Sequence, residues 1–569
     1  MFKLRRFLKN YKKELILGPF FKLLEAVFEL IVPIVMAKII DNGITKNDEG
    51  YILRMSGVIV LLGVCGLAFA LICQYFAAKC AYGFGTELRQ ALYSHVNKFS
   101  HSEIDKFGTS SLITRITNDS VLVQNGVNMF IRLAVRAPFL IVGATVMSMM
   151  IDLKLSLILI GSALVITAVI VLIKKATLPM FKKIQKGLDK ISLLTRESLD
   201  GVRVIRAFSR QKQKTEELDE NTRELSKACI NAGRVSAILN PLTFMIINLG
   251  IVAVMHFGGV RVDSGHMTQG ELTAFVNYMN QILLVLIVLS NLIVIFSKAS
   301  SSAARVNEIF DTLPSVTDGK GAVPDMSAPC IAFENVSFAY PDAAENSLEG
   351  ISFTLKKGQT LGIIGGTGSG KSTLANLIPR FFDATEGSIK IFGSDIKDYK
   401  QSELRSLMGI VPQKAALFSG TIADNMRWGK TNADDNEIKS ALDTAQCTEF
   451  VEKMSFGTDT HISQGGKNLS GGQRQRLTIA RAIVGRPPIV ILDDSMSALD
   501  YATDLELRKA LKESLSDSCV VMISQRATTL KNADTIIVLD DGKAVGMGTH
   551  EELLSTCGEY REIYDSQMN

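Results

Sequence analysis

Long apolar stretches fill the first part of the chain, up to about residue 310 of 569. Six of them approach the length of about 20 residues that crosses a bilayer as a helix. The stretch from Leu155 to Ile173 contains no charged residue, which argues against a soluble helix bundle. The six predicted membrane helices are residues 15–40, 55–78, 128–150, 155–174, 237–260 and 273–297.

Two long polar connections, residues 79–127 and 175–236, separate these stretches and carry an amphipathic helical pattern. We therefore expect helices 2–3 and 4–5 to extend well beyond the bilayer. Lys and Arg crowd the segment before the first helix and the second long connection, whereas the loops after helices 1, 3 and 5 are poor in them. The positive-inside rule then places both termini and both connections in the cytoplasm of a multi-pass plasma-membrane protein.

The hydrophobic pattern changes near Leu313. Residues 313–329 contain three prolines and two glycines, which predicts a linker. Short strand-like runs then alternate with helical segments, which predicts an α/β domain over 330–569, behind an all-α membrane domain over 1–312. The predicted strands include Cys330–Tyr340, Thr360–Ile364, Ile489–Leu492, Cys519–Ser524 and Thr535–Leu539.

Charge and cysteine content add little to this division. The net charge of +5 is small for the length and gives no reason to expect a nucleic-acid partner. None of the eight cysteines forms a C-x-x-C pair or a Cys/His cluster with metal spacing. We expect them to be buried or lipid-facing thiols in a reducing compartment.

A glycine-rich loop follows the predicted strand Thr360–Ile364 and precedes a helix. It fits the phosphate-binding pattern G-x-x-x-x-G-K-[ST], in which backbone N–H groups and the helix N-terminus converge on phosphate oxygens. Lys371 is expected to reach the β- and γ-phosphates, and the Ser372 hydroxyl to bind Mg²⁺. The loop comprises Gly365, Gly366, Thr367, Gly368, Ser369, Gly370, Lys371, Ser372 and Thr373.

The strand Ile489–Leu492 is fully apolar and ends in the carboxylate of Asp493. A buried central strand of this kind delivers an acid at its carboxyl end. Asp493 is therefore the expected Mg²⁺ partner across from Ser372.

A third motif, Leu469-Ser470-Gly471-Gly472-Gln473, lies between the other two and resembles the signature of the ATP-binding cassette (ABC) family. Further matches are the adenine-stacking aromatic at Tyr340, the glutamine loop at Gln413 and the loop Ser497-Ala498-Leu499-Asp500. The resemblance implies a P-loop ATP-binding cassette with ATP and Mg²⁺ as cofactors. It assigns the nucleotide to Tyr340, the phosphate loop, Gln413 and Ser470 to Gln473, and the metal to Ser372, Gln413 and Asp493.

Six membrane helices ahead of one cassette look like an exporter half-transporter of this family. The resemblance implies that two cassettes pair head to tail, so that each ATP lies between the phosphate loop of one and the signature of the other. It also implies coupling helices near residues 105–115 and 200–210 that dock on the cassettes, the second of them on the partner's.

Three positions depart from the family pattern: Asp494 stands where the catalytic glutamate belongs, Gln525 where the switch histidine belongs, and Gln464 where a glutamate precedes the signature. Asp is one methylene shorter than Glu, so its carboxylate falls about 1 Å or more short of the attacking water. A general base contributes typically 10²–10⁴ in rate. We expect ATP binding with poor hydrolysis and a heterodimeric partner chain that carries Glu and His. In the alternative, Asp494 works through a backbone adjustment.

Glu25 and Glu29 lie one turn apart on the same face of the first helix. Intramembrane acids suggest a cavity or a proton or cation site, which would favour cationic substrates. The structural alternatives are pairing with Lys22 or a neighbouring helix, and a position near the membrane interface. The leading functional hypothesis is export of amphipathic small molecules, drug-like compounds or lipids, by an ABC-type ATPase. The alternatives are an ATP-gated regulator or channel, and a peptide or metabolite exporter of the same fold.

Overall fold

The computed structural model describes residues 2–341, 343–497 and 499–568, which form two compact units. Unit 1 is Met1–Val96 with Ser110–Asp311, and unit 2 is Asn97–Thr109 with Thr312–Asn569. A short piece of the first long polar connection thus folds with the C-terminal unit. Ala498, part of the predicted loop 497–500, lies outside the described residues.

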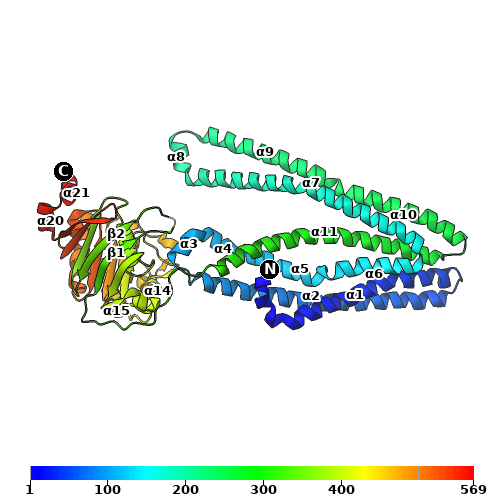
Figure 1. Ribbon diagram of the computed structural model, residues 1–569, viewed down its shortest axis with the longest axis horizontal. Helices are drawn as coiled ribbons and strands as arrows, with labels where there is room; N and C mark the ends of the chain where they lie inside the picture. The colour runs from blue at the N-terminus through cyan, green and yellow to red at the C-terminus, as the bar shows by residue number, and fades with distance from the viewer. Residues whose placement is uncertain (1, 342, 498, 569) are drawn as a thin grey trace. The chain divides into compact units, whose positions relative to one another are not determined.

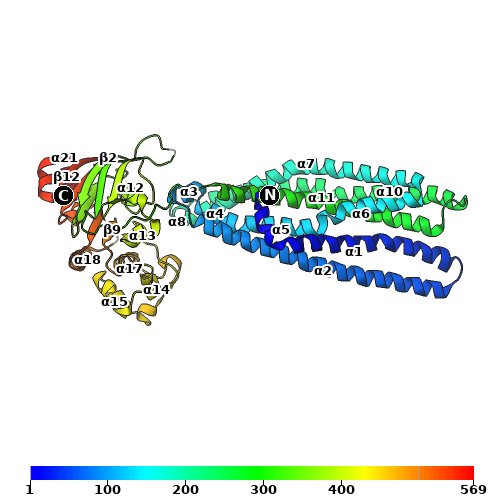
Figure 2. The same cartoon turned by 60° about the horizontal axis from the view of Figure 1, so that its bottom comes forward.

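The regular elements of unit 1 are all helices in its described residues, and these helices run alongside one another (Figure 1). α7 lies beside α9 and α10, which return along it (Figure 1), and Figure 2 shows α10 next to α7 as well. The principal helices are η1 (Phe2–Tyr11), α1 (Lys12–Lys38), α2 (Glu49–Val96), α4 (Thr109–Thr114), α5 (Ser120–Met129), α6 (Arg136–Ile151), α7 (Leu153–Asp200), α8 (Val202–Ala207), α9 (Gln211–Ala237), α10 (Leu239–Asp263) and α11 (Gln269–Asp311).

Five helical stretches among the described residues are long and apolar enough to cross a membrane. The predicted first membrane helix, α1, is not one of the five. It carries Lys22, Glu25 and Glu29 within its apolar stretch, and it packs along α2. The five stretches are Glu49–Val96, Thr109–Ile151, Leu153–Asp200, Gln211–Asp263 and Gln269–Asp311.

Two of the helices have the length that the predicted extension beyond the bilayer requires. α2 and α7 have 48 residues each. At 1.5 Å per residue each is roughly 72 Å long, more than twice the hydrocarbon thickness of about 30 Å. α7 begins sharply because the Asp152 side chain accepts hydrogen bonds from the N–H groups of Lys154 and Leu155 at 2.9 and 3.0 Å.

Unit 2 is built on a six-stranded sheet in the order β12-β11-β3-β10-β9-β6. β11, β3, β10, β9 and β6 are parallel, and β12 closes one edge antiparallel to β11. The predicted α/β class is thereby confirmed. The strands are β3 (Thr360–Gly365), β6 (Met408–Val411), β9 (Ile489–Asp493), β10 (Cys519–Ile523), β11 (Thr535–Asp540) and β12 (Lys543–Gly548).

A second, antiparallel sheet of order β2-β1-β4-β5 covers part of the same core. Its strands are β1 (Ile331–Phe338), β2 (Leu348–Leu355), β4 (Glu386–Ile391) and β5 (Ser394–Asp395). A short pair, β7 (Gly420–Thr421) and β8 (His461–Ile462), stands apart from both sheets. The helices are α3 (His101–Phe107), α12 (Lys371–Leu377), α13 (Gln401–Ser406), α14 (Ile422–Arg427), α15 (Asp435–Thr444), α16 (Thr448–Glu452), α17 (Gly471–Ile483), α18 (Tyr501–Ser514), α19 (Ala527–Leu530), α20 (His550–Thr556) and α21 (Gly558–Met568).

The predicted linker 313–329 is part of unit 2 and is hydrogen-bonded to other residues of that unit. Gly319 N–H donates to Tyr399 O at 2.9 Å, and Asp325 N–H donates to Phe392 O at 3.1 Å. Prolines and glycines in this segment therefore indicate irregular backbone, but not a free tether.

Two of the eight cysteines differ from the expectation of free thiols. Cys330 and Cys519, both buried in the core of unit 2, form a disulfide between residues 189 apart in the chain. Their spacing in the sequence gives no hint of this pairing, because β1 and β10 come together only through the fold. The other six cysteines are free.

Candidate functional site

Three loops that follow adjacent parallel strands gather the predicted catalytic groups. β10 lies between β3 and β9, so the loops that leave their carboxyl ends meet at one edge of the sheet. The phosphate loop follows β3, Asp493 ends β9 with Asp494 directly behind it, and Gln525 comes two residues after β10. Ligands bind at this edge in open α/β sheets.

The phosphate loop adopts backbone angles that favour glycine. Gly368 and Gly370 have φ of +86° and +95°, and a Cβ on Gly370 would lie 2.7 Å from Ser347 O. Lys371, at the start of α12, folds back over the loop: its Nζ donates to Gly365 O at 3.0 Å and also to Gly366 O. Burial lowers the pKa of Lys371, and the nearby charges of Asp494 and Asp493 oppose this shift. The ammonium group is thus held where phosphates are expected.

A cavity of about 650 Å³ brings the predicted nucleotide ligands together. The Tyr340 hydroxyl lies 3.1 Å from the Thr373 hydroxyl, so the predicted base-stacking residue adjoins the phosphate loop. The predicted residues that line the cavity are Tyr340, Thr367, Gly368, Gly370, Lys371, Ser372, Thr373, Gln413 and Gln525.

Seven further residues of the lining were missed by the sequence reasoning. Five form the loop between β1 and β2, and two form the Asp-Gly turn between β11 and β12. An Asp-Gly pair between strands is a recognisable turn signal, but only the fold places this turn beside the phosphate loop. The seven are Ala343, Ala344, Glu345, Asn346, Ser347, Asp541 and Gly542.

Ser372 and Asp493 form the predicted metal pair. The Ser372 hydroxyl donates to Asp493 Oδ1 at 3.2 Å. Burial raises the pKa of Asp493, and the hydrogen bond from Ser372 opposes the rise. One hydroxyl, one carboxylate and the amide oxygen of Gln413 suit Mg²⁺, which takes its other ligands from water and nucleotide phosphates. The described residues contain no cluster of three His, Cys, Asp or Glu that could hold a metal.

Asp494 occupies an unusual backbone position. Its φ is +45°, in the left-handed region, and its N–H donates to Ile523 O at 3.0 Å. Burial raises the pKa of its carboxyl group, while a hydrogen bond from Gln413 and the charge of Lys371 oppose the rise. Asp494 therefore lies next to the nucleotide cavity, where its carboxylate is hydrogen-bonded to Gln413 of the cavity wall.

The signature motif lies away from the cavity lining. Ser470 caps α17: its hydroxyl accepts from Gln473 N–H at 3.2 Å, and its own N–H donates to Gln473 Oε1 at 2.9 Å. Ser470 and Gly471 are exposed, and a Cβ on Gly471 would meet no atom within 4 Å. The structure thus leaves Gly471 open to approach from outside.

Helix α3 overlaps the predicted first coupling segment, near 105–115, only at its last three residues, and it is part of unit 2. The His101 ring stacks on Phe381 at 4.3 Å, and Phe382 lies beside both His101 and Tyr340, at 6.0 and 5.3 Å between ring centroids. Ser100 and Glu103 form a capping box, and Ser315 N–H donates to Glu103 Oε1 at 3.2 Å. We call the rings of His101, Phe382 and Tyr340 the aromatic column.

Acidification is expected to loosen α3. Burial lowers the pKa of His101, the charge of Asp105 opposes this, and that of Arg405 reinforces it. Because the packed state disfavours the proton, its stabilisation is complete above the free-histidine pKa of about 6.5 and is lost as the pH falls below it. Hydrogen exchange of residues 97–109, corrected for intrinsic rates, should accelerate between about pH 7.5 and pH 5.5. A His101→Phe variant should lose this dependence, and an unchanged dependence would contradict the assignment.

The predicted second coupling segment has a different environment. α8 turns the chain between α7 and α9, and none of its residues is buried. Val204 and Phe208 are 60% and 73% exposed. Within the described residues, this apolar surface is uncovered.

Glu25 and Glu29 both have cationic partners in unit 1. Lys22 Nζ lies 2.6 Å from Glu25 Oε2, and Arg136 lies 2.5 Å from Glu29 Oε2. Gln281 donates to Glu29 O at 3.3 Å. The pairing favours a structural role, the alternative to a cavity for cationic substrates.

Comparison with known proteins assigns both units. The model of the ABC transporter transmembrane region matches residues 15–286, and that of the ABC transporter matches residues 348–497. An uncharacterised ABC transporter ATP-binding protein of Mycobacterium tuberculosis is 37% identical over 99% of this chain and 97% of its own length. The ATP-dependent lipid A-core flippase of Haemophilus ducreyi is 29% identical over 99% of this chain and 97% of its own length.

A solved structure of a bacterial Atm1-family ABC exporter with ATP bound has the same fold, with a TM-score of 0.81, 24% identity and coverage of 98% of both chains. These similarities extend along nearly the full length of the chain, so they cover both the membrane helices of unit 1 and the nucleotide cavity of unit 2. The chain therefore belongs to the ABC transporters, as an ATP-hydrolysing membrane protein in which one membrane domain precedes one nucleotide-binding domain.

Proposed function

We propose that this chain is one subunit of an exporter that moves amphipathic small molecules, drug-like compounds or lipids, out of the cytoplasm by alternating access. Its own ATP site hydrolyses slowly, and a different partner chain completes the competent site. The observation that carries the proposal is the pair Asp494 and Gln525, at positions where the family places glutamate and histidine.

The geometry around Asp494 supports slow hydrolysis. Its N–H is bonded to Ile523 O at 3.0 Å, which fixes the backbone at the end of β9. Moving the shorter side chain toward the attacking water would break this bond and the contact with Gln413. Gln525 lines the cavity, but an amide cannot carry the positive charge that a histidine can.

The exposed signature supports a partner. Ser470 and Gly471 are open to solvent, so another chain's phosphate-bound nucleotide can approach the start of α17. Two uncovered apolar residues, Val204 in α8 and Phe208 directly after it, suit the predicted docking on a partner cassette. A chain that has an intact signature but a weak catalytic site of its own shows the combination expected of the degenerate-site subunit of a heterodimer.

The membrane orientation and the substrate class form part of the proposal. Six cations before and at the start of α1 support a cytoplasmic N-terminus, which would give the unit 2 site access to cytoplasmic ATP. These cations are Lys3, Arg5, Arg6, Lys9, Lys12 and Lys13. The relation to a lipid A-core flippase supports an amphipathic substrate.

The purified chain alone should bind ATP and turn it over slowly. Binding is measured with a fluorescent ATP analogue, and phosphate release is followed in the same sample. We expect near-stoichiometric binding, with residual turnover that Asp494→Asn leaves nearly unchanged. Robust turnover that Asp494→Asn abolishes would overturn the degenerate-site proposal, since Asp494 would then act as the general base. A chain that binds no ATP would overturn the assignment of the nucleotide cavity itself.

A further inference from the structure

Unit 1 contains a cavity of about 650 Å³ beside η1. This cavity shares no lining residue with the nucleotide cavity. Its walls come from η1, α1, α2, α5 and α11, together with Phe130. This volume lies within the range of small-molecule sites, about 300–1,000 Å³. We call it the N-terminal pocket.

η1 has an apolar face and a basic face. Leu4, Phe7, Leu8 and Tyr11 recur at helical spacing, and the positions between them are basic or polar. The apolar face packs on the bundle, because Leu4 is buried and the Phe7 ring lies against Phe84 and Phe310. The exposed basic side chains directly precede the predicted first membrane helix, and such a segment is attracted to anionic headgroups. The pocket therefore opens beside the end of the membrane-spanning bundle where lipid headgroups are expected.

The charge in the pocket wall has one sign. Arg5, Arg6, Lys9 and Lys12 line it, and no acidic residue does. Arg6 rests over the Phe310 ring at 4.4 Å, whereas Arg5, Lys9 and Lys12 form no ion pair within the described part of the chain.

The acids nearest in sequence or space are already bonded to other groups. Glu14 pairs with Lys79 at 2.8 Å, Asp311 pairs with Lys3 at 2.7 Å, and Glu87 accepts from Asn10 at 3.1 Å. The positive charge of the pocket is thus left for an external anion.

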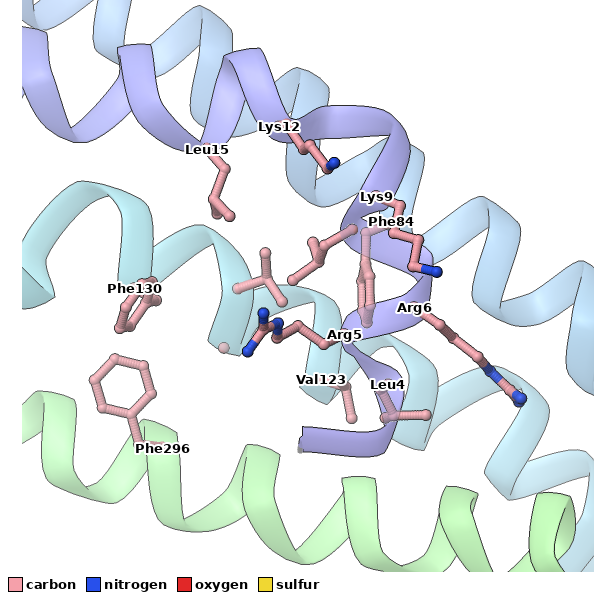
Figure 3. A pocket seen from close by; sticks show the side chains of 13 residues that line it. Leu4, Arg5, Arg6, Lys9, Lys12, Leu15, Phe84, Val123, Phe130 and Phe296 are labelled. Atoms are coloured by element: carbon pink, nitrogen blue, oxygen red, sulfur yellow. The ribbon is translucent and has the colours of Figure 1, made fainter.

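The rest of the wall is apolar. Phe130 and Phe296 contact each other edge to face at 6.4 Å. In Figure 3, the Arg5 side chain points into the pocket toward the side where these two rings lie. The other apolar lining residues are Leu4, Leu8, Leu15, Phe84, Val123 and Val127.

We propose that the N-terminal pocket binds an anionic phospholipid of the surrounding membrane. The phosphate would be held by Arg5, Lys9 and Lys12, and part of an acyl chain would lie along Leu15, Phe130 and Phe296. Guanidinium and ammonium groups bind phosphate through charge-assisted hydrogen bonds, and the apolar wall distinguishes a lipid from a free anion. The inference does not depend on which compound is transported.

A site-specific fluorescence experiment tests the proposal in the full-length chain. The chain has a single tryptophan, Trp428, in unit 2. Trp428→Phe combined with Phe296→Trp leaves one indole, in the pocket. The protein is placed in nanodiscs that contain either brominated phosphatidylglycerol or brominated phosphatidylcholine as quencher. We expect several-fold stronger quenching by the anionic lipid at equal mole fraction.

Charge variants then separate the pocket from general attraction. Arg5→Gln with Lys9→Gln should reduce the preference for the anionic lipid about tenfold or more, because each cation near the surface contributes substantially to anionic lipid binding. Arg5→Lys with Lys9→Arg keeps the charge and should keep the preference. The matched control Lys182→Gln with Lys186→Gln, on exposed residues of α7, removes the same charge elsewhere. ATP-analogue binding checks that every variant is folded.

Three outcomes would overturn the proposal. Equal quenching by the two lipids would exclude a site for anionic lipid. An equal loss in the α7 control would show that general surface charge accounts for the preference. Relief of the quenching by millimolar inorganic phosphate would show that the pocket binds free anions.

Discussion

A chain that carries Asp494→Glu together with Gln525→His is expected to hydrolyse ATP about 10²-fold faster than the natural sequence. The added methylene moves the carboxylate toward the attacking water, and the imidazole restores a group that can hold positive charge near the γ-phosphate. A positioned general base contributes typically 10²–10⁴ in rate, so partial recovery is the conservative expectation. The measurement is steady-state phosphate release by the purified chain at saturating ATP.

The two single variants show which residue limits the rate. Asp494→Glu alone should give most of the gain, because it changes the reach of the base. Asp517→Glu lengthens an exposed acid that pairs with Lys357 on the surface, and it should have no effect. Unchanged turnover in the double variant, with ATP binding intact, would mean that another feature of this cassette limits hydrolysis.

Replacing Lys371 by Met should weaken ATP binding about 10²-fold. The Lys371 ammonium already lies over the loop, where it donates to Gly365 O at 3.0 Å and contacts Ser369 Oγ at 3.4 Å. Nucleotide phosphates would replace these neutral acceptors with charged ones, and a hydrogen bond to a charged group contributes about 1.5–3 kcal/mol. Titration with a fluorescent ATP analogue measures the loss.

The control for this variant is Lys357→Met, which removes an exposed lysine of unit 2 that pairs with Asp517 at 3.2 Å. It should leave ATP affinity unchanged. Thermal unfolding without nucleotide should show that Lys371→Met remains folded. If Lys371→Met binds ATP as tightly as the natural chain, the phosphate assignment of this loop is wrong.

The sequence was sufficient where chemistry and hydrophobic pattern coincide. The phosphate loop between a buried strand and a helix, and Asp493 at the end of an apolar strand, each require a particular local backbone, so their positions follow from the residues alone. The great length of α2 and α7 was also predictable, because their amphipathic pattern continues past the apolar stretches.

The sequence was insufficient where the fold joins distant segments. Glu345 and Asp541 line the nucleotide cavity because β2 and β12 bring two loops to the same edge, which no local pattern encodes. Residues 97–109 fold with unit 2 although they precede it by about 200 residues. The partner of Glu29, Arg136, lies 107 residues away, so the sequence alone could not decide between a substrate cavity and an ion pair.

The aromatic column has a consequence for how the molecule senses its nucleotide. Tyr340 contacts Phe382, and Phe382 contacts His101 of α3, so α3 is linked through two aromatic contacts to the predicted base-stacking residue. With adenine stacked on Tyr340, as predicted, the base would help to hold α3 in place, which the phosphates in the loop would not do. An inorganic triphosphate would then fill the phosphate loop without a base on Tyr340, and it would leave α3 as it is in the empty protein.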